Sequence, residues 1–142
     1  MNTYFEQMVL SASPVELIRL LYQRAIRSVR EAREHLRNGR IEERCASINR
    51  ASSVLMELTS SLRADVAPEV TERLTHLYAY MMNRLVEANL QQRDEPLEEV
   101  ASLMLTLEEA WCAIPDYHTL VKREESPLRR AAAGVTSKVM AG

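Results

Sequence analysis

Histidines are the residues of this chain whose type and spacing come nearest to a metal site. They stand at positions 35, 76 and 118, and glutamates at 31 and 72 precede the first two by four residues. A di-iron helical bundle needs Glu-x-x-His on two helices, so that both side chains of each motif face one metal pair. The four-residue spacing does not meet that need. We therefore expect surface histidines and no metal ligands.

Cysteines and paired glutamates are the other candidates for catalysis. Cys45 and Cys112 have no metal-like spacing and no neighbouring base that would activate a thiolate, so they read as reduced thiols of a cytoplasmic protein. The pairs Glu98-Glu99 and Glu108-Glu109 are sequence neighbours, which point about 100° apart on a helix. With three glycines in the chain, a glycine-rich phosphate loop is not expected. The sequence predicts neither an enzyme nor a cofactor.

Composition limits the class of protein further. The 142 residues suit one domain, and a hydrophobic fraction of 46% with 5% aromatics and few glycines favours helices. A net charge of -2 gives no reason to expect nucleic acid as a partner. No run approaches the roughly 18 apolar residues of a membrane span, and the first residues lack the pattern of a secretory signal.

Helix-start and helix-stop signals divide the chain. Ser13, Pro14 and Glu16 form a capping box with proline at the first helical position, and Gly39 is a helix stop. Apolar periodicity predicts helices over about 14–38, 41–62, 68–92 and 96–114. Short connections between long amphipathic helices predict an all-α protein, an antiparallel up-down-up-down four-helix bundle. The bundle would span 13–115, between an N-terminal apolar arm (1–12) and a flexible C-terminal tail (116–142).

The predicted core stripes leave apolar residues over. The second helix would bury a stripe of Ile41, Cys45, Ile48, Ser52, Leu55, Leu58 and Leu62, and the third one of Val70, Leu74, Leu77, Met81, Leu85 and Ala88. Beside or off the main stripes fall Leu17, Leu20, Tyr22, Tyr78, Tyr80, Met82, Val86 and Leu103. Some of these would widen the core face. A contiguous set left outside would be an interaction surface.

Charge is distributed unevenly between the first and last helices. Residues 13–39 carry a net charge of +3, and residues 94–114 carry six acids and no base. Either these helices are neighbours and screen each other, or one of them presents its charge to a partner, which would affect association rate more than affinity.

Three motifs together resemble one protein family. They are Ser11-Ala12-Ser13-Pro14-x-Glu16-Leu17 followed by Leu21-Tyr22-x-x-Ala25-Ile26; Leu77-Tyr78-x-Tyr80-Met81-x-x-Arg84-Leu85-x-x-Ala88-Asn89; and Ala110-Trp111. In order and spacing, over roughly residues 4–114, they resemble the flagellin export chaperones of the FliS family. There are two departures from that pattern: Gln23-Arg24 replaces the usual Asp-Gly, and Ala79 replaces an aspartate between the two tyrosines.

The resemblance implies a cytoplasmic chaperone that binds the C-terminal helical segment of flagellin, prevents its premature polymerisation and assists flagellar type III export. Components of the export apparatus would be further partners. The residues that we expect to contact flagellin are Met8, Leu10, Tyr22, Tyr78, Met81, Met82, Leu85 and Asn89.

Several of these residues have a structural alternative. Met81 and Leu85 lie on the predicted core stripe, the two tyrosines can bury their rings, and Asn89 can bridge helix ends. The arm with Met8 and Leu10 either lies in a groove and is displaced by flagellin, or packs on the first helical turn as a hydrophobic staple.

Other functions use the same bundle. It could be an adaptor that binds an anti-sigma factor or another flagellar export component, or a self-associating structural bundle. As a chaperone it would be a monomer or a weak homodimer.

Overall fold

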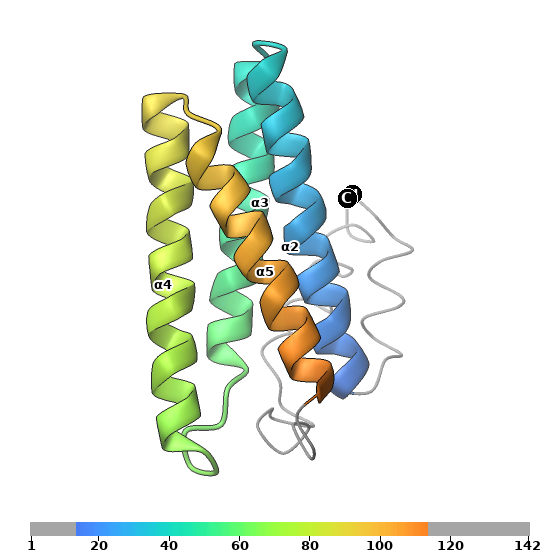
Figure 1. The fold of residues 1–142 in the computed structure, drawn as a ribbon, viewed down its shortest axis with the longest axis vertical. Helices are drawn as coiled ribbons and strands as arrows, with labels where there is room; N and C mark the ends of the chain where they lie inside the picture. The colour runs from blue at the N-terminus through green and yellow to red at the C-terminus, as the bar shows by residue number, and fades with distance from the viewer. Residues whose placement is uncertain (1–13, 114–142) are drawn as a thin grey trace, which may run out of the picture.

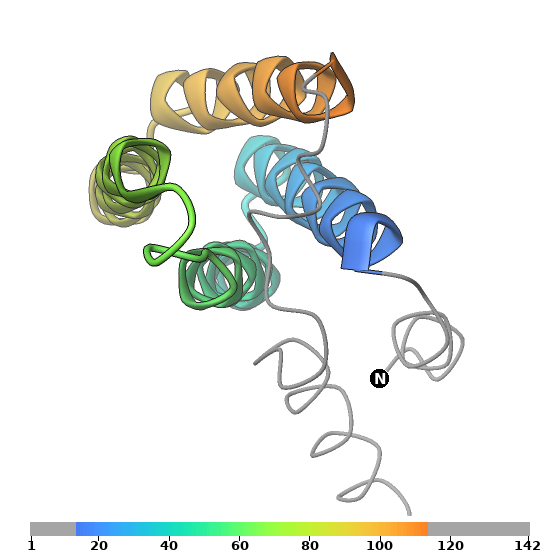
Figure 2. The ribbon, with the colours of Figure 1, turned by 90° about the horizontal axis from the view of Figure 1, so that it is seen from below.

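Four helices make up the part of the chain that the structure, a computed structural model, describes: residues 14–113, with the side chains of 16–111. They are α2 (Pro14–Arg37), α3 (Ile41–Ser60), α4 (Pro68–Gln91) and α5 (Glu95–Ala113). The chain reverses at each turn, and the helices pack in a ring in which α5 returns to α2 (Figures 1 and 2). The predicted up-down-up-down bundle is confirmed. The N-terminal arm and the C-terminal tail lie outside the described residues.

Left-handed residues close two of the helices. Gly39 has φ +68°, and behind it the backbone N–H of Arg40 donates to the carbonyl of His35 at 3.0 Å. This is the glycine stop that the sequence predicts, because a residue without Cβ adopts positive φ at little cost. Gln92 does the same for α4 with φ 53°. None of the helices described is both long enough and apolar enough to cross a membrane.

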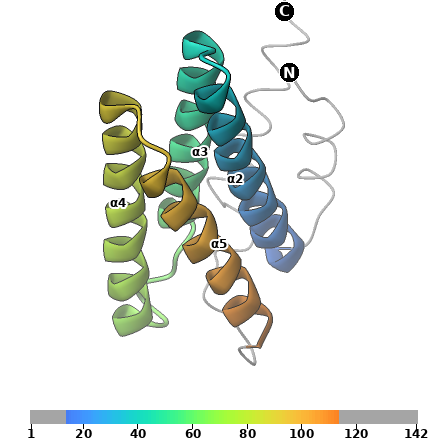
Figure 3. The ribbon, with the colours of Figure 1, turned by 45° about the horizontal axis from the view of Figure 1, so that its top comes forward.

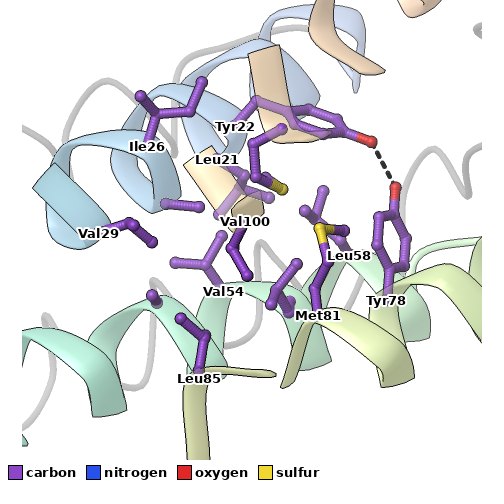
Figure 4. Packing of buried hydrophobic residues seen from close by; sticks show 14 of the residues in the cluster. Leu21, Tyr22, Ile26, Val29, Val54, Leu58, Tyr78, Met81, Leu85 and Val100 are labelled. Atoms are coloured by element: carbon purple, nitrogen blue, oxygen red, sulfur yellow. Dashed lines mark hydrogen bonds between the residues drawn. The ribbon is translucent and has the colours of Figure 1, made fainter. Parts of the chain in front are cut away.

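Helix α2 provides a wider core face than its predicted stripe. Leu17 and Tyr22, expected beside the stripe, have exposed fractions of 1% and 0%. The reason is that α2 packs against both α3 and α5, so an arc of its surface wider than one stripe is covered. Figure 4 shows Leu21, Tyr22, Ile26 and Val29 of this helix converging on residues of the other three.

Helix α3 is rotated relative to the predicted stripe. Ile41 is 59% exposed, so its inward placement was wrong, and Cys45 and Ser52 are half-buried at the edge of the core face. The buried residues are instead Arg44, Ser47, Ile48, Ala51, Val54, Leu55 and Leu58. Helix α3 packs more extensively on α2 than on α4, which turns its most buried face toward α2.

The first half of α4 is poorly covered. No residue of α4 before Tyr78 is buried, and Val70, predicted to face inward, is 40% exposed. Figures 1 and 3 show the cause: α4 and α5 are close at their shared turn and then diverge, and α5 ends beside the start of α2. The beginning of α4 therefore has one fewer neighbouring helix than its end.

An ion pair ties the α4–α5 turn to α2. The Arg33 guanidinium donates two hydrogen bonds to the Asp94 carboxylate, at 2.8 and 2.9 Å, and Glu98 lies 3.9 Å away. The expectation that the basic first helix and the acidic last helix are neighbours is confirmed. The hydrogen bonds from Arg33 hold the pKa of Asp94 below its usual value.

Replacing Asp94 with Asn should test this tie. Because the pKa of Asp94 is depressed in the folded state, its contribution is present above the ordinary carboxyl pKa and is lost as pH falls through the folded-state value. Both side chains are partly exposed, so we expect D94N to lower the free energy of unfolding by about 0.5–1 kcal/mol at neutral pH. Urea denaturation at several pH values would measure it.

The difference between D94N and the unmodified protein should shrink on acidification. The control is D65N, since Asp65 pairs with Arg63 only two residues away in the chain. A D94N penalty that persisted unchanged in acid would contradict an electrostatic origin.

Candidate functional site

Three aromatic side chains meet at the centre of the bundle. The Trp111 Nε1–H of α5 donates to the Tyr22 hydroxyl of α2 at 2.6 Å, and that hydroxyl shares a 2.5 Å hydrogen bond with the Tyr78 hydroxyl of α4. Figure 4 shows the two tyrosines pointing toward each other from their helices. Both are 0% exposed and Trp111 is 4% exposed. One hydroxyl thus joins three of the four helices.

Burial governs the protonation of this cluster. Removal from water raises the pKa of Tyr22 strongly and raises the pKa of Tyr78 to about 12. Both hydroxyls are therefore protonated at neutral pH, and each buried polar group has a partner within the cluster. Such an arrangement fixes helix register rather than supplying a reactive group.

Four of the residues that the sequence singles out for flagellin contact are covered in this structure. Tyr22, Tyr78, Met81 and Leu85 are each 0% exposed. Their side chains fill the space between α2, α3 and α4 (Figure 4). These side chains belong to the core and do not form the outer surface of the bundle.

Asn89 and Met82 are the two predicted residues that reach the surface within the described part of the chain. Asn89 Oδ1 accepts hydrogen bonds from Arg44 Nε at 3.0 Å and from Cys45 Sγ at 3.5 Å, so it bridges α4 to α3. Met82, seven residues earlier, is half-buried against the core. The other two predicted residues, Met8 and Leu10, lie outside the described residues.

An apolar row continues outward from Met82. Val86 and Leu90 follow it at four-residue intervals, with exposed fractions of 52% and 76%, and we call these three residues the α4 stripe. Met56 on α3 is 60% exposed and follows Cys45 by three helical turns, so it lies on the face of α3 that meets Asn89. Apolar side chains at this spacing on a helix surface are typical of a contact with a partner helix.

Charged groups cover the other side of α4, along α5. Glu99 accepts hydrogen bonds from the Tyr80 hydroxyl at 2.8 Å and from Arg84 Nε at 2.7 Å, and Arg84 also pairs with Glu87. The hydrogen bonds from Tyr80 and Arg84 lower the pKa of Glu99. The face of α4 toward α5 is thus occupied by ion pairs, which leaves the side toward α3 as its apolar surface.

The described histidines and cysteine do not converge. His35 accepts a hydrogen bond from Arg40 Nε at 3.0 Å, His76 is exposed on another helix, and Cys45 contacts Asn89. Within residues 16–111 no three metal-ligating side chains come together. His118 and Cys112 lie outside the residues whose side chains are described.

Sequence reasoning missed Arg44 and Leu90 at this surface. Arg44 is 6% exposed although it is charged. Its spacing of four from Ile48 is a signal for a position on the buried side of α3, but charge normally argues against burial. Leu90 stands four residues after Val86, which the sequence did flag.

The aromatic cluster gives a stability prediction. Tyr22→Phe removes the buried hydroxyl that accepts from Trp111 and bonds to Tyr78, so we expect the free energy of unfolding to fall by about 1–3 kcal/mol. Tyr78→Phe removes one bond and leaves the other, and it should cost less. Urea denaturation followed by far-UV circular dichroism would measure both.

A matched control is Tyr80→Phe, since Tyr80 is 44% exposed and bonds only at the surface. It should change stability little. If Y78F proved as costly as Y22F, the central place of the Tyr22 hydroxyl would be refuted.

Comparison with known proteins places these features in a family. Residues 1–117 match the family described as "Flagellar protein FliS". The chain is 33% identical over 107 residues to the flagellar secretion chaperone FliS of Salmonella typhimurium, covering 75% of this chain and 79% of the relative. It is 33% identical to flagellar secretion chaperone FliSB of Pseudomonas aeruginosa, covering 77% and 86%, and 29% identical to the Campylobacter jejuni FliS, covering 85% and 94%. The chain belongs to the FliS family of flagellar proteins.

Proposed function

We propose that this protein is a cytoplasmic flagellar secretion chaperone that binds the C-terminal helical segment of flagellin. It would keep flagellin from polymerising early and hold it until the flagellar type III export apparatus, its second partner, receives it. The relatives support this proposal because they are named as flagellar secretion chaperones. The observation on this chain that carries it is the exposed apolar α4 stripe beside α3.

The α4 stripe suits an amphipathic helix as its occupant. Met82, Val86 and Leu90 progress from half-buried to 76% exposed, so one edge of the row is anchored in the core and the other is free to bury a partner. A helical client with apolar residues at three- and four-residue spacing can cover such a row. A client segment that orders on binding loses conformational entropy, which a long apolar contact offsets.

The buried residues have a supporting role in this proposal. Tyr78, Met81 and Leu85 hold α4 against the core from beneath, while Met82 and Asn89 on its surface contact flagellin. Tyr22 acts through its bond to Tyr78. We therefore divide the predicted contact residues into a surface pair and a set that positions α4.

Met8 and Leu10 remain part of the proposal, although the arm that carries them lies outside the described residues. We propose that both side chains occupy the apolar surface of the free protein and yield it to flagellin. Amide hydrogen exchange of residues 8–10, compared with and without a flagellin C-terminal fragment, should then accelerate on binding. Unchanged exchange would instead favour a staple on the first turn of α2.

Replacing Leu90 with Gln should weaken client binding without unfolding the bundle. The side chain is exposed in the free protein, so stability should change by no more than about 0.5 kcal/mol. Loss of its burial against the client should lower affinity roughly tenfold. Calorimetric titration with a flagellin C-terminal fragment would measure the affinity.

The control variant is L105Q, because Leu105 is 39% exposed on α5, away from the α4 stripe. It should bind like the unmodified protein. Equal affinities for all three proteins would remove the stripe from the binding surface, and no binding by the unmodified protein would refute the proposed function.

A further inference from the structure

A buried arginine without a counter-ion stands at the edge of the α4 stripe. Arg44 of α3 is 6% exposed, and its guanidinium has one hydrogen bond among the described residues, from Nε to Asn89 Oδ1. No carboxylate of the described residues lies within ion-pair distance of it, whereas Arg33, Arg50 and Arg84 each have one. Its terminal nitrogens are not among the buried atoms that lack a partner, so they are accessible to a ligand while the stem of the side chain is covered.

Asn89 is oriented by its two neighbours. Its Oδ1 accepts from Arg44 Nε and from Cys45 Sγ, and both of these groups are donors. That fixes Oδ1 as the end of the amide that meets Arg44 and Cys45, and it leaves Nδ2 as a second donor beside the guanidinium. Within residues 16–111 neither Nδ2 nor the terminal nitrogens of Arg44 have an acceptor, so two sets of N–H donors are unused at one place.

The electrostatics of this place favour an anion. The acidic residues of the same helical turn, Glu42 and Glu43, are exposed and form no ion pair with Arg44. Arg44 also stands in the first turn of α3, where the helix dipole is positive. The donors are adjacent to the α4 stripe, since Asn89 follows Val86 by three residues and precedes Leu90 by one.

We propose that Arg44 and Asn89 form a carboxylate-binding subsite that receives an aspartate or glutamate side chain of the bound flagellin segment. This inference rests on the proposed function and adds a polar determinant to it. The α4 stripe binds the apolar face of the client helix, and the Arg44 terminal nitrogens with Asn89 Nδ2 bind a carboxylate at the edge of that face. Planar guanidinium donors suit a carboxylate, and such charge-assisted bonds are strong when partly buried.

Arg44→Met tests the subsite, with Arg50→Met as its control on the same helix. Arg50 pairs with Glu31 of α2 at 3.4 Å and does not reach Asn89. We expect R44M to keep the bundle folded, because methionine replaces the covered apolar stem of Arg44, and to lower affinity for a flagellin C-terminal fragment roughly 10- to 100-fold. R50M should retain the unmodified affinity.

Client variants then identify the carboxylate. Each Asp or Glu of the fragment is changed to Asn or Gln, and one further peptide has an amidated C-terminus. We expect a single one of these side-chain changes to weaken binding of the fragment to the unmodified protein and to leave its binding to R44M unchanged. If amidation alone produced that pattern, a side chain as the ligand would be refuted.

The variant Asn89→Asp is an independent test, because we expect it to change stability and client affinity in opposite directions. The new carboxylate would pair with Arg44, so the bundle should become more resistant to urea while client affinity falls. A purely structural role for Asn89 would move stability and affinity together. If R44M and N89D bound flagellin normally, the subsite would be refuted while the proposed function stood; if the unmodified protein did not bind, both would fall.

Discussion

The hydroxyl of Tyr22 is the point on which the arrangement of this bundle depends. It accepts a hydrogen bond from Trp111 and shares another with Tyr78, so helices α2, α4 and α5 are joined through one atom. These groups are removed from water and can satisfy one another only in a single register of the three helices. Apolar packing around them tolerates small sliding movements, whereas the hydrogen bonds do not.

Because these bonds fix the position of α4, each of its faces has a defined environment. Its inner face is committed to the core by Tyr78, Met81 and Leu85, and its face toward α5 is committed to ion pairs through Arg84. The side toward α3 packs on that helix and is held to it by Asn89, and its outer edge bears the α4 stripe. Exposed apolar side chains therefore gather there, at the edge of a rigid framework, which is a suitable place to bind a segment that has no fixed structure of its own.

The α3–α4 edge also differs from the rest of the bundle in the partner of its arginine. Arg33 and Arg84 each lie against carboxylates across a helix boundary, and these pairs join α2 and α4 to α5. Arg44 lies deeper than either of them and has an amide as its partner. Where interhelical pairs serve only to hold the bundle, the chain supplies the anion itself; at Arg44, within the described residues, it does not.

Much of the architecture follows from local signals. Gly39 and the prolines at 14, 68 and 96 mark where helices end and begin, and three- and four-residue apolar spacing identifies each helix. The family motifs are also read directly from the sequence. Stripe periodicity failed at Ile41 and Val70, since it gives the direction of a helix's apolar face but not how far each neighbouring helix covers it.

The sequence by itself determined that this protein is a four-helix bundle of the FliS family, because helix limits and apolar period are properties of consecutive residues. Only the tertiary structure decided which flagged residues form the surface. Tyr22 and Tyr78 lie 56 residues apart, and their mutual hydrogen bond places both in the core. Arg44 and Asn89 become one site only when α3 and α4 pack. Apolar periodicity predicts which face of a helix is buried, but its extent and the hydrogen-bond partners are set by contacts between distant segments.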